Sequence, residues 1–371
     1  MRSYRVACIP VLAVSSFIAL FLVSTTAKPS SSSAGSLIAV APMLEPRSGH
    51  SSTLLPDGRV LIVGGMRRNQ DFYRSAEFFD PSTSRFQKSG EMNIARVGHA
   101  AILLNSGKVL IVGGWTGHAC TDSAELYDPS TSSFALIGHM TTRRGQPIAT
   151  LLKNGDVLIT GGADHDTPGG IASAEIFHPT TQTFEAISPM HSGRISHTAT
   201  LLKDGRVLVA GGRGDAVNSS AELFDPQAKS FSLTGNMLTA RYKHTAGLLP
   251  DGRVLVAGGS DERDWNGNLS AAEIFEPRTG KFTATAALHA SRFKLPEPAV
   301  QLASGQLVIA GGSPSVELFD GTTGTFEPVS GHLDAAWHFI TEILLKDGRV
   351  LLTGGYASND RATDHAWIYQ P

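Results

Sequence analysis

A pair of adjacent glycines recurs seven times along this 371-residue chain, and this recurrence constrains the fold more than any other feature. Successive pairs lie 43 to 53 residues apart. Each pair follows a short apolar run such as residues 59–63, and most of these runs follow a turn dipeptide such as Asp57-Gly58. Asp-Gly and Asn-Gly favour two-residue hairpin turns, because both central residues of such turns adopt positive φ. A unit of this length repeated seven times predicts a repeat architecture rather than two or three independent domains.

Each repeat contains two further segments with strand character. The third segment has the pattern SAELYDP, as in residues 123–129, and the fourth begins at an aromatic residue such as Phe86 or Phe134. No stretch shows sustained helical periodicity. Four antiparallel strands per unit at this period predict the blade of a β-propeller. The fold class expected is therefore all-β, a seven-bladed propeller spanning residues 36–371.

The two ends of the repeat region complement each other. The seventh repeat stops at Pro371 after its third strand, whereas residues 37–43 have the fourth-strand pattern and precede the first repeat. We expect the N-terminal strand to pair with the last blade and close the ring. Closure would remove the exposed strand edges that otherwise promote aggregation.

These repeats resemble the kelch family. The resemblance rests on the Gly-Gly pairs, on the aromatic residue within SAELYDP and on the period. The sequence LLPDGRVLVAGG at residues 248–259 is similar to the propeller domain of galactose oxidase and related secreted proteins. In copper radical oxidases of that type, inner-strand positions carry a Tyr and a Cys that become crosslinked, and a Tyr-His pair precedes the LLPDGRV-like sequence. Here Cys120 lies in a loop and the nearest match is Tyr242-Lys243-His244, so we expect the radical copper site to be absent.

The first 27 residues have the three parts of a signal peptide. Arg2 and Arg5 precede an apolar stretch at residues 6–23, and small residues follow it. We therefore expect an exported protein that is secreted, periplasmic or at the cell surface. An uncleaved membrane anchor is the alternative, because the apolar stretch is near the lower limit for spanning a bilayer. Residues 28–35 are expected to form a Ser-rich linker. A net charge of −2 gives no general attraction to nucleic acid.

An arginine and a glutamate recur at fixed places in the repeat. The Arg precedes the first strand and the Glu lies in the third strand. In repeat six we assign the Arg position to Lys294, and in repeat seven Trp337 and Trp367 occupy the two positions. Since acid and base disappear together in repeat seven, we expect them to pair and to stabilise the blade.

The candidate site lies at the end of the propeller where the first strands begin and the variable loops emerge. Three positions after the Arg, the repeats carry His50, His99, Pro147, His197, His244, Glu297 and Ile340. Three interpretations stay open for this ring. The histidines hydrogen-bond to neighbouring blades, or they line a funnel for a polar ligand, or His197, His244 and Glu297 bind a divalent metal. Trp115, Trp265 and Trp337 are candidates to stack on sugar rings, although they also suit packing against neighbouring blades.

The resulting functional hypothesis is an exported, non-catalytic scaffold that binds a glycan or protein at the loop-bearing mouth and needs no cofactor. The alternative is a carbohydrate-active enzyme, either a galactose-oxidase-like metalloenzyme or a sugar mutarotase. A mutarotase needs an acid–base pair, which the His and Glu side chains of the ring are able to supply. The sequence identifies no catalytic residue.

Overall fold

A computed structural model describes residues 35–371 apart from 69–70, 165–168, 296–297 and 358–360. The predicted signal peptide and most of the predicted linker lie outside the described residues, so export stays a prediction. Among the residues that the structure does describe, no helix has the length and apolar character needed to cross a bilayer.

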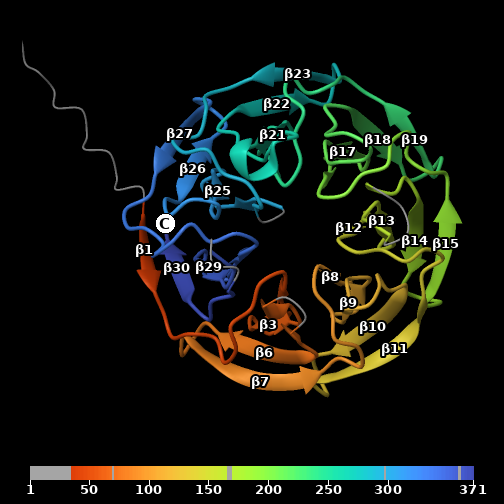
Figure 1. The fold of residues 1–371 in the computed structure, drawn as a ribbon, viewed down its shortest axis with the longest axis vertical. Coiled ribbons are helices and arrows are strands. Elements are labelled where there is room, and N and C mark those ends of the chain that lie inside the picture. Colours follow the sequence, from red (N-terminus) through yellow and green to blue (C-terminus); the bar gives the residue numbers. More distant parts are fainter. Residues whose placement is uncertain (1–34, 69–70, 165–168, 296–297, 358–360) are drawn as a thin grey trace, which may run out of the picture. The chain divides into compact units, whose positions relative to one another are not determined.

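Seven four-stranded antiparallel sheets are arranged as blades in a ring, which confirms the predicted fold (Figure 1). Blade one consists of β2 (Ser51–Leu54), β3 (Val60–Val63), β6 (Ser75–Asp80) and β7 (Arg85–Glu91). Blade two contains β8 (Ala100–Leu103), β9 (Val109–Val112), β10 (Ser123–Asp128) and β11 (Ser133–His139), and blade three contains β12 (Ile148–Leu151), β13 (Val157–Thr160), β14 (Ala174–His178) and β15 (Thr183–Ile187). Blade four contains β16 (Thr198–Leu201), β17 (Val207–Ala210), β18 (Ala221–Asp225) and β19 (Ser230–Leu233).

The remaining blades follow the same order. Blade five contains β20 (Thr245–Leu248), β21 (Val254–Ala257), β22 (Ala272–Glu276) and β23 (Lys281–Ala284), and blade six contains β24 (Val300–Gln301), β25 (Leu307–Ile309), β26 (Glu317–Asp320) and β27 (Thr325–Pro328). Blade seven contains β28 (Thr341–Leu344), β29 (Val350–Thr353), β30 (Ala366–Gln370) and the N-terminal strand β1 (Ser36–Ala39). Outside the blades, the described chain has a small hairpin, β4 (Met66–Arg68) with β5 (Asp71–Phe72), and one turn of 3-10 helix, η1 (Asp264–Asn266).

Ring closure occurs as predicted. The N-terminal strand β1 pairs antiparallel with β30, and Leu37 lies opposite Tyr369. The backbone N–H of Leu37 also donates a hydrogen bond to the carbonyl of Ser330 in the preceding blade, at 2.9 Å. The first described residues of the chain therefore fasten the last blade to the rest of the ring.

The hydrophobic core is divided among the seven blade interfaces. Each cluster of buried side chains combines two adjacent blades, as where Leu61 of blade one packs with Val109 and Tyr127 of blade two. The second strands are buried along their whole length, as in β3 and β9, because sheets cover them on both faces. This burial explains why they are continuous apolar runs. The Gly-Gly pairs permit the blades to approach closely, since a Cβ added at Gly64 would lie 2.7 Å from the carbonyl oxygen of Arg96.

The repeated Arg and Glu pair in six blades. In blade two, Arg96 Nη2 lies 2.8 Å from Glu125 Oε1, and both side chains are fully buried. Arg96 Nη1 also donates to the carbonyls of Gly113 and Ser123, at 2.8 and 3.2 Å. The guanidinium thus ties the Gly-Gly turn to the start of the third strand. The other pairs are Arg47–Glu77, Arg144–Glu175, Arg194–Glu222, Arg241–Glu273 and Arg292–Glu317.

In blade six, the structure corrects the Arg position that the sequence predicts. The paired arginine is Arg292 rather than Lys294, and the position three residues later belongs to Leu295 rather than Glu297. The first strand of this blade, β24, has only two residues. The chain between Arg292 and the turn dipeptide Ser304-Gly305 is longer than in the other repeats, so counting back from the turn leads to Lys294. Glu297 itself lies outside the described residues. In blade seven, the rings of Trp337 and Trp367 lie 6.0 and 5.8 Å from that of His365, in place of the ion pair.

Candidate active site

The variable loops and the starts of the first strands meet at one end of the ring, as expected. Backbone bridges join the two segments in six blades, for example Tyr242 with Ser260 and His338 with Tyr356. The residue after this bridge has a positive φ, as at Lys243 (54°) and Phe339 (53°), and so does Lys294 (56°) at the equivalent place in blade six. We call this set of positions the mouth ring; it consists of Gly49, Gly98, Gln146, Ser196, Lys243, Lys294 and Phe339. Backbone hydrogen bonds link neighbouring members, such as Lys243 to Ser196 at 3.0 Å.

The four predicted histidines lie between blades. Their exposed fractions are small, and each Nε2 lies within hydrogen-bonding distance of a hydroxyl on the preceding blade. The pairs are His50–Thr353 (3.0 Å), His99–Ser51 (2.9 Å), His197–Thr160 (2.9 Å) and His244–Thr198 (3.1 Å). Burial lowers the pKa of His50, His99 and His197 to about 3, so these rings are neutral at physiological pH. This arrangement is the one expected for packing residues, and ligand binding by the four side chains stays a prediction.

The structure does not bring His197 and His244, the two described candidates for metal binding, together on one site. The rings of His197 and His244 each have their own threonine partner. Within the described ranges, no group of three or more His, Cys, Asp or Glu side chains is placed to hold a metal ion.

The three candidate tryptophans occupy different surroundings. Trp115 is half-buried and forms backbone bridges to Val97 and Cys120. Trp337 packs on the cluster between blades six and seven, and its Nε1 donates to Asp334 Oδ1 at 2.7 Å. Trp265, in η1, is 45% exposed. Trp265 is thus the most accessible of the three.

Beside Trp265 lies a polar cluster that the sequence analysis did not assemble. Tyr242 OH donates to Asp264 Oδ1 at 2.6 Å, and Lys243 Nζ donates to the same oxygen at 2.7 Å. We call these three residues the Tyr–Lys–Asp cluster. Both bonds use Oδ1, and no described residue donates a hydrogen bond to Oδ2 of Asp264. Since the Asp264 side chain is 34% exposed, its carboxylate is accessible to a ligand at the mouth.

The protonation states of this cluster follow from its contacts. Partial burial by itself raises the pKa of Asp264, but hydrogen bonds from Lys243 and Tyr242 outweigh burial and hold that pKa below its usual value. Burial and the bond to Asp264 raise the pKa of Tyr242 well above its usual value. At neutral pH the cluster therefore contains an ionised carboxylate, a protonated phenol and the Lys243 side chain. Asp264 also has φ of 50°, in the left-handed region that non-glycine residues seldom adopt outside constrained sites.

An aromatic group adjoins the cluster and joins three blades. Lys294 Nζ lies 3.7 Å from the centroid of the Trp265 ring and 2.5 Å from Tyr356 OH. The Trp265 ring also makes edge-on contacts with Phe293 and His338, with centroids 5.0 Å away in both cases. Burial lowers the pKa of His338 to about 4, so its ring is neutral at physiological pH. These residues come from blades five, six and seven, which are adjacent in the ring (Figure 1).

Sequence reasoning had singled out parts of this site without joining them. Tyr242-Lys243-His244 and Trp265 are each visible in the sequence, but no spacing in the sequence indicates that Asp264 contacts Tyr242 and Lys243. Lys294 had been assigned to the Arg position. The structure separates Tyr242 and Lys243, which lie at the mouth, from His244, which faces the neighbouring blade.

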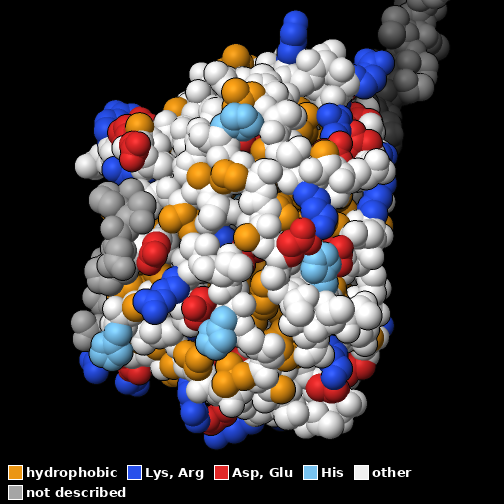
Figure 2. All heavy atoms as spheres, turned by 90° about the vertical axis from the view of Figure 1, so that its right-hand side faces the viewer, with side chains coloured by type: hydrophobic (Ala, Val, Ile, Leu, Met, Phe, Trp, Pro, Cys, Tyr) orange, Lys and Arg blue, Asp and Glu red, His pale blue; other side chains and the backbone are white. Residues whose placement is uncertain are grey.

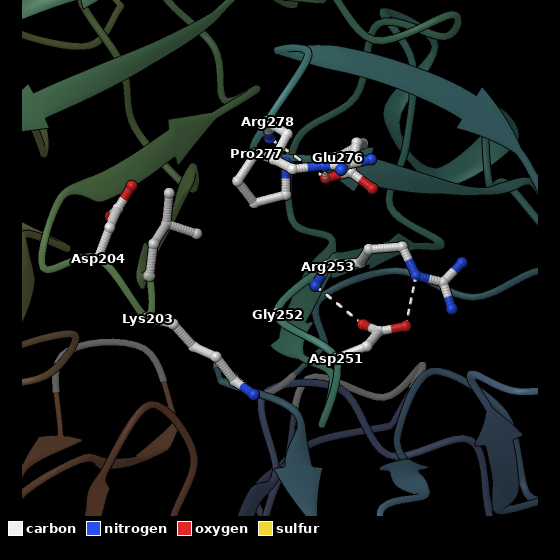
Figure 3. Close-up of a pocket in the computed structure, with 9 residues that line it drawn as sticks. Lys203, Asp204, Asp251, Gly252, Arg253, Glu276, Pro277 and Arg278 are labelled. Carbon is white, nitrogen blue, oxygen red and sulfur yellow. Dashed lines mark hydrogen bonds and ion pairs between the residues drawn. The ribbon is translucent and has the colours of Figure 1, made fainter.

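Two hollows lie at the opposite end of the propeller, where the Asp-Gly turns are. One, of about 380 Å³, lies between blades four and five and is lined by Lys203, Asp204, Asp251, Arg253 and Glu276 among others (Figure 3). The second, of about 410 Å³, occupies the equivalent place between blades six and seven. Their equivalent positions indicate that the repeat geometry produces them.

On the flank shown in Figure 2, charged, histidine and hydrophobic side chains are scattered without a single large patch.

Comparisons with known proteins agree with this architecture. Residues 96–141 match the kelch motif. A solved structure of a fungal alcohol oxidase of the AA5 family, in complex with copper, aligns with a TM-score of 0.73 and 16% sequence identity, covering 91% of this chain and 76% of that chain. A comparison with curated protein sequences found no significant match. At this identity the structural likeness shows the fold alone.

The comparison corrects the leading functional hypothesis. The similar solved structure is an enzyme, so the comparison speaks against the expected non-catalytic scaffold and favours the enzymatic alternative. The residues that resemble the Tyr-His pair of copper oxidases do not converge on one place. Tyr242 bonds to Asp264 at the mouth, whereas His244 faces Thr198 of the neighbouring blade, and the described residues contain no group of three His, Cys, Asp or Glu side chains placed to hold a metal ion.

Proposed function

We propose that the protein is a carbohydrate-active enzyme that performs acid–base chemistry at the Tyr–Lys–Asp cluster. The observation that carries the proposal is the ionised carboxylate of Asp264. Its Oδ1 accepts hydrogen bonds from Tyr242 and Lys243, and its side chain is 34% exposed beside an exposed indole. An aromatic face next to a fixed carboxylate suits a sugar ring, which has an apolar face and hydroxyl groups at its edge.

The simplest reaction that this cluster supports is the interconversion of the anomers of a free aldose. Asp264 Oδ2 accepts the proton of the anomeric hydroxyl, and Lys243 donates a proton to the ring oxygen. The bond between the anomeric carbon and the ring oxygen breaks, giving the open-chain aldehyde. Rotation about the adjacent carbon–carbon bond and reversal of the proton transfers then give the other anomer. The reaction is redox-neutral and consumes no co-reactant.

Lys243 is suited to the donor role because an ammonium carries three N–H donors. One contacts Asp264 Oδ1 and another approaches Tyr242 OH at 3.4 Å. In the proposed reaction the third donates to a substrate oxygen. Tyr242, whose raised pKa keeps it protonated, holds the carboxylate in place.

The test is the rate of anomer exchange, followed by NMR or polarimetry, for a panel of neutral, acidic and N-acetylated aldoses. We expect saturable acceleration with at least one aldose. Asp264→Asn should lower kcat/KM by about 100-fold or more, as for loss of a general base. Asp261→Asn is the matched control, because Asp261 lies in the same loop but bonds to Arg263.

Two results would overturn the proposal. One is an anomer exchange rate equal to the buffer rate for every aldose. The other is protein that holds stoichiometric copper and oxidises a primary alcohol to an aldehyde while reducing O2 to H2O2.

A further inference from the structure

We infer that Lys294 is a positioning residue that holds Trp265, and through it Asp264, over the mouth. The inference rests on the proposed function for its effect on catalysis. Its structural part, the control of Trp265 by Lys294, stands on contacts alone.

The contact between Lys294 and Trp265 is a cation–π contact on the ring face. A distance of 3.7 Å from Nζ to the ring centroid is well inside the range in which an ammonium is attracted by an indole. The ammonium also donates a hydrogen bond to Tyr356 OH at 2.5 Å, and Lys294 is 5% exposed. Phe293 and Phe339 lie within 4.9 and 5.7 Å of the same ammonium. These contacts hold the Lys294 ammonium in place, and the indole of Trp265 packs against it.

The loop that carries Trp265 is otherwise held by blade five, by itself and by blade four, where Glu262 accepts a hydrogen bond from the backbone N–H of Val217 and lies 3.7 Å from Arg213. Its backbone bonds run between Asp261 and Gly267 and between Gly267 and Asp264. Ser260, at its start, pairs with Tyr242. Backbone hydrogen bonds join Gly259 and Leu269, at the two ends of the loop, to Arg292 of blade six. Between these ends, the described side-chain contacts of the loop with blades six and seven are made by the Trp265 ring.

Trp265 follows Asp264 directly in the chain, so the position of the indole constrains the carboxylate. Asp264 holds φ of 50°, a conformation that persists only where the surroundings fix it. Loss of the Lys294 anchor should let the loop sample other positions and weaken the alignment of Asp264 with substrate. The sugar-stacking surface, which is the exposed part of Trp265, would be displaced as well.

The experiment uses the full-length protein labelled with 5-fluorotryptophan and observed by ¹⁹F NMR. The chain has four tryptophans, so Trp265→Phe assigns the Trp265 resonance. In Lys294→Met we expect that resonance to broaden or split, and its shift between H2O and D2O to move towards that of a fully exposed indole. The other three resonances and the melting temperature should change little. Lys294→Arg should restore a single line, because a guanidinium also stacks on indole.

Gln146→Met is the matched control. Gln146 holds the same mouth-ring position in blade three, with φ of 53°, so it tests the effect of methionine in this backbone conformation. We expect it to leave the Trp265 resonance unchanged. Where anomer exchange is measurable, Lys294→Met should lower kcat/KM by about 10- to 100-fold, as for a misplaced catalytic group, and Lys294→Arg should recover most of the loss.

An unchanged Trp265 resonance in Lys294→Met overturns the inference whatever the activity. So does a variant in which all four resonances shift and the melting temperature falls, because Lys294 would then act as a general structural residue. A selective change at Trp265 in a protein without anomer exchange supports the inference and refutes the proposed function.

Discussion

At the scale of single residues, the buried Arg–Glu pairs stabilise the blades without forming a binding surface. Arg144 and Glu175 are both fully buried, and Glu175 also accepts hydrogen bonds from the backbone N–H groups of Thr141 and Thr142. The carboxylate thus joins the first-strand connection to the third strand. The recurrence of the pair in the sequence reflects this packing role.

Glu175→Ala should therefore destabilise the protein strongly, since it leaves Arg144 buried without its charge partner. We expect a loss of about 3–5 kcal/mol in the free energy of unfolding, measured by urea denaturation. Glu91→Ala is the control, because the Arg74–Glu91 pair has a similar distance of 2.9 Å but is largely exposed, and its loss should change stability little. If Glu175→Ala and the parent protein have the same free energy of unfolding, the buried arginines have a role other than packing.

The buried histidines predict a dependence of stability on pH. The folded pKa of His197 is about 3, against an ordinary value of 6.5, so the unfolded state binds more protons between these values. The stability contributed by the neutral ring is full above pH 6.5 and is lost as pH falls towards 3. Each such histidine should lower the free energy of unfolding by about 1.4 kcal/mol per pH unit well below 6.5.

The measurement compares urea denaturation at pH 7.5 and pH 5. His197→Gln should flatten the dependence on pH relative to the parent protein, whereas replacement of the exposed His118 by Gln should not. A parent protein that gains stability on acidification across this range would show that the rings are not held neutral.

At the scale of elements, the strands were predictable and the site was only partly so. The turn glycines, the apolar second strands and the Gly-Gly pairs are local signals, and each repeat forms the strands that they predict. The expectation of positive φ at both turn residues is wrong, because only the glycine, as at Gly58, has it. The Arg position of blade six is also corrected, since the paired residue is Arg292 and not Lys294. The Tyr–Lys–Asp cluster was not predicted, because it joins residues at the start of β20 to a residue of a variable loop. That contact depends on loop conformation, which repeat spacing does not encode.

The closing strand β1 gives a test at this scale. Removal of residues 1–40 should lower the melting temperature and promote aggregation, because β30 would become an exposed edge. Removal of residues 1–34 is the control and should leave the melting temperature unchanged. Thermal unfolding with size-exclusion chromatography measures both effects. Identical behaviour of the two truncations would show that β1 does not fasten the ring.

At the scale of the whole molecule, the packing residues and the proposed site occupy different parts of the closed ring. Blade interfaces carry the core, the ion pairs and the histidines. Blades five to seven are adjacent in the ring (Figure 1). The mouth over them carries the partly exposed carboxylate of Asp264, two lysines and the accessible indole of Trp265. The histidines recur at one position of the repeat, so the sequence pattern reveals them. The Tyr–Lys–Asp cluster and Trp265 do not recur from repeat to repeat, so the pattern does not indicate them.

The central claim is that reaction takes place at Asp264 and not at the histidine ring. It is tested most directly by the ratio of kcat/KM values for anomer exchange in Asp264→Asn and His197→Gln, each measured per folded molecule. We predict that His197→Gln keeps most of the parent activity while Asp264→Asn loses about 100-fold or more. Full activity in Asp264→Asn together with loss in His197→Gln would contradict the account and place the reaction among the buried imidazoles.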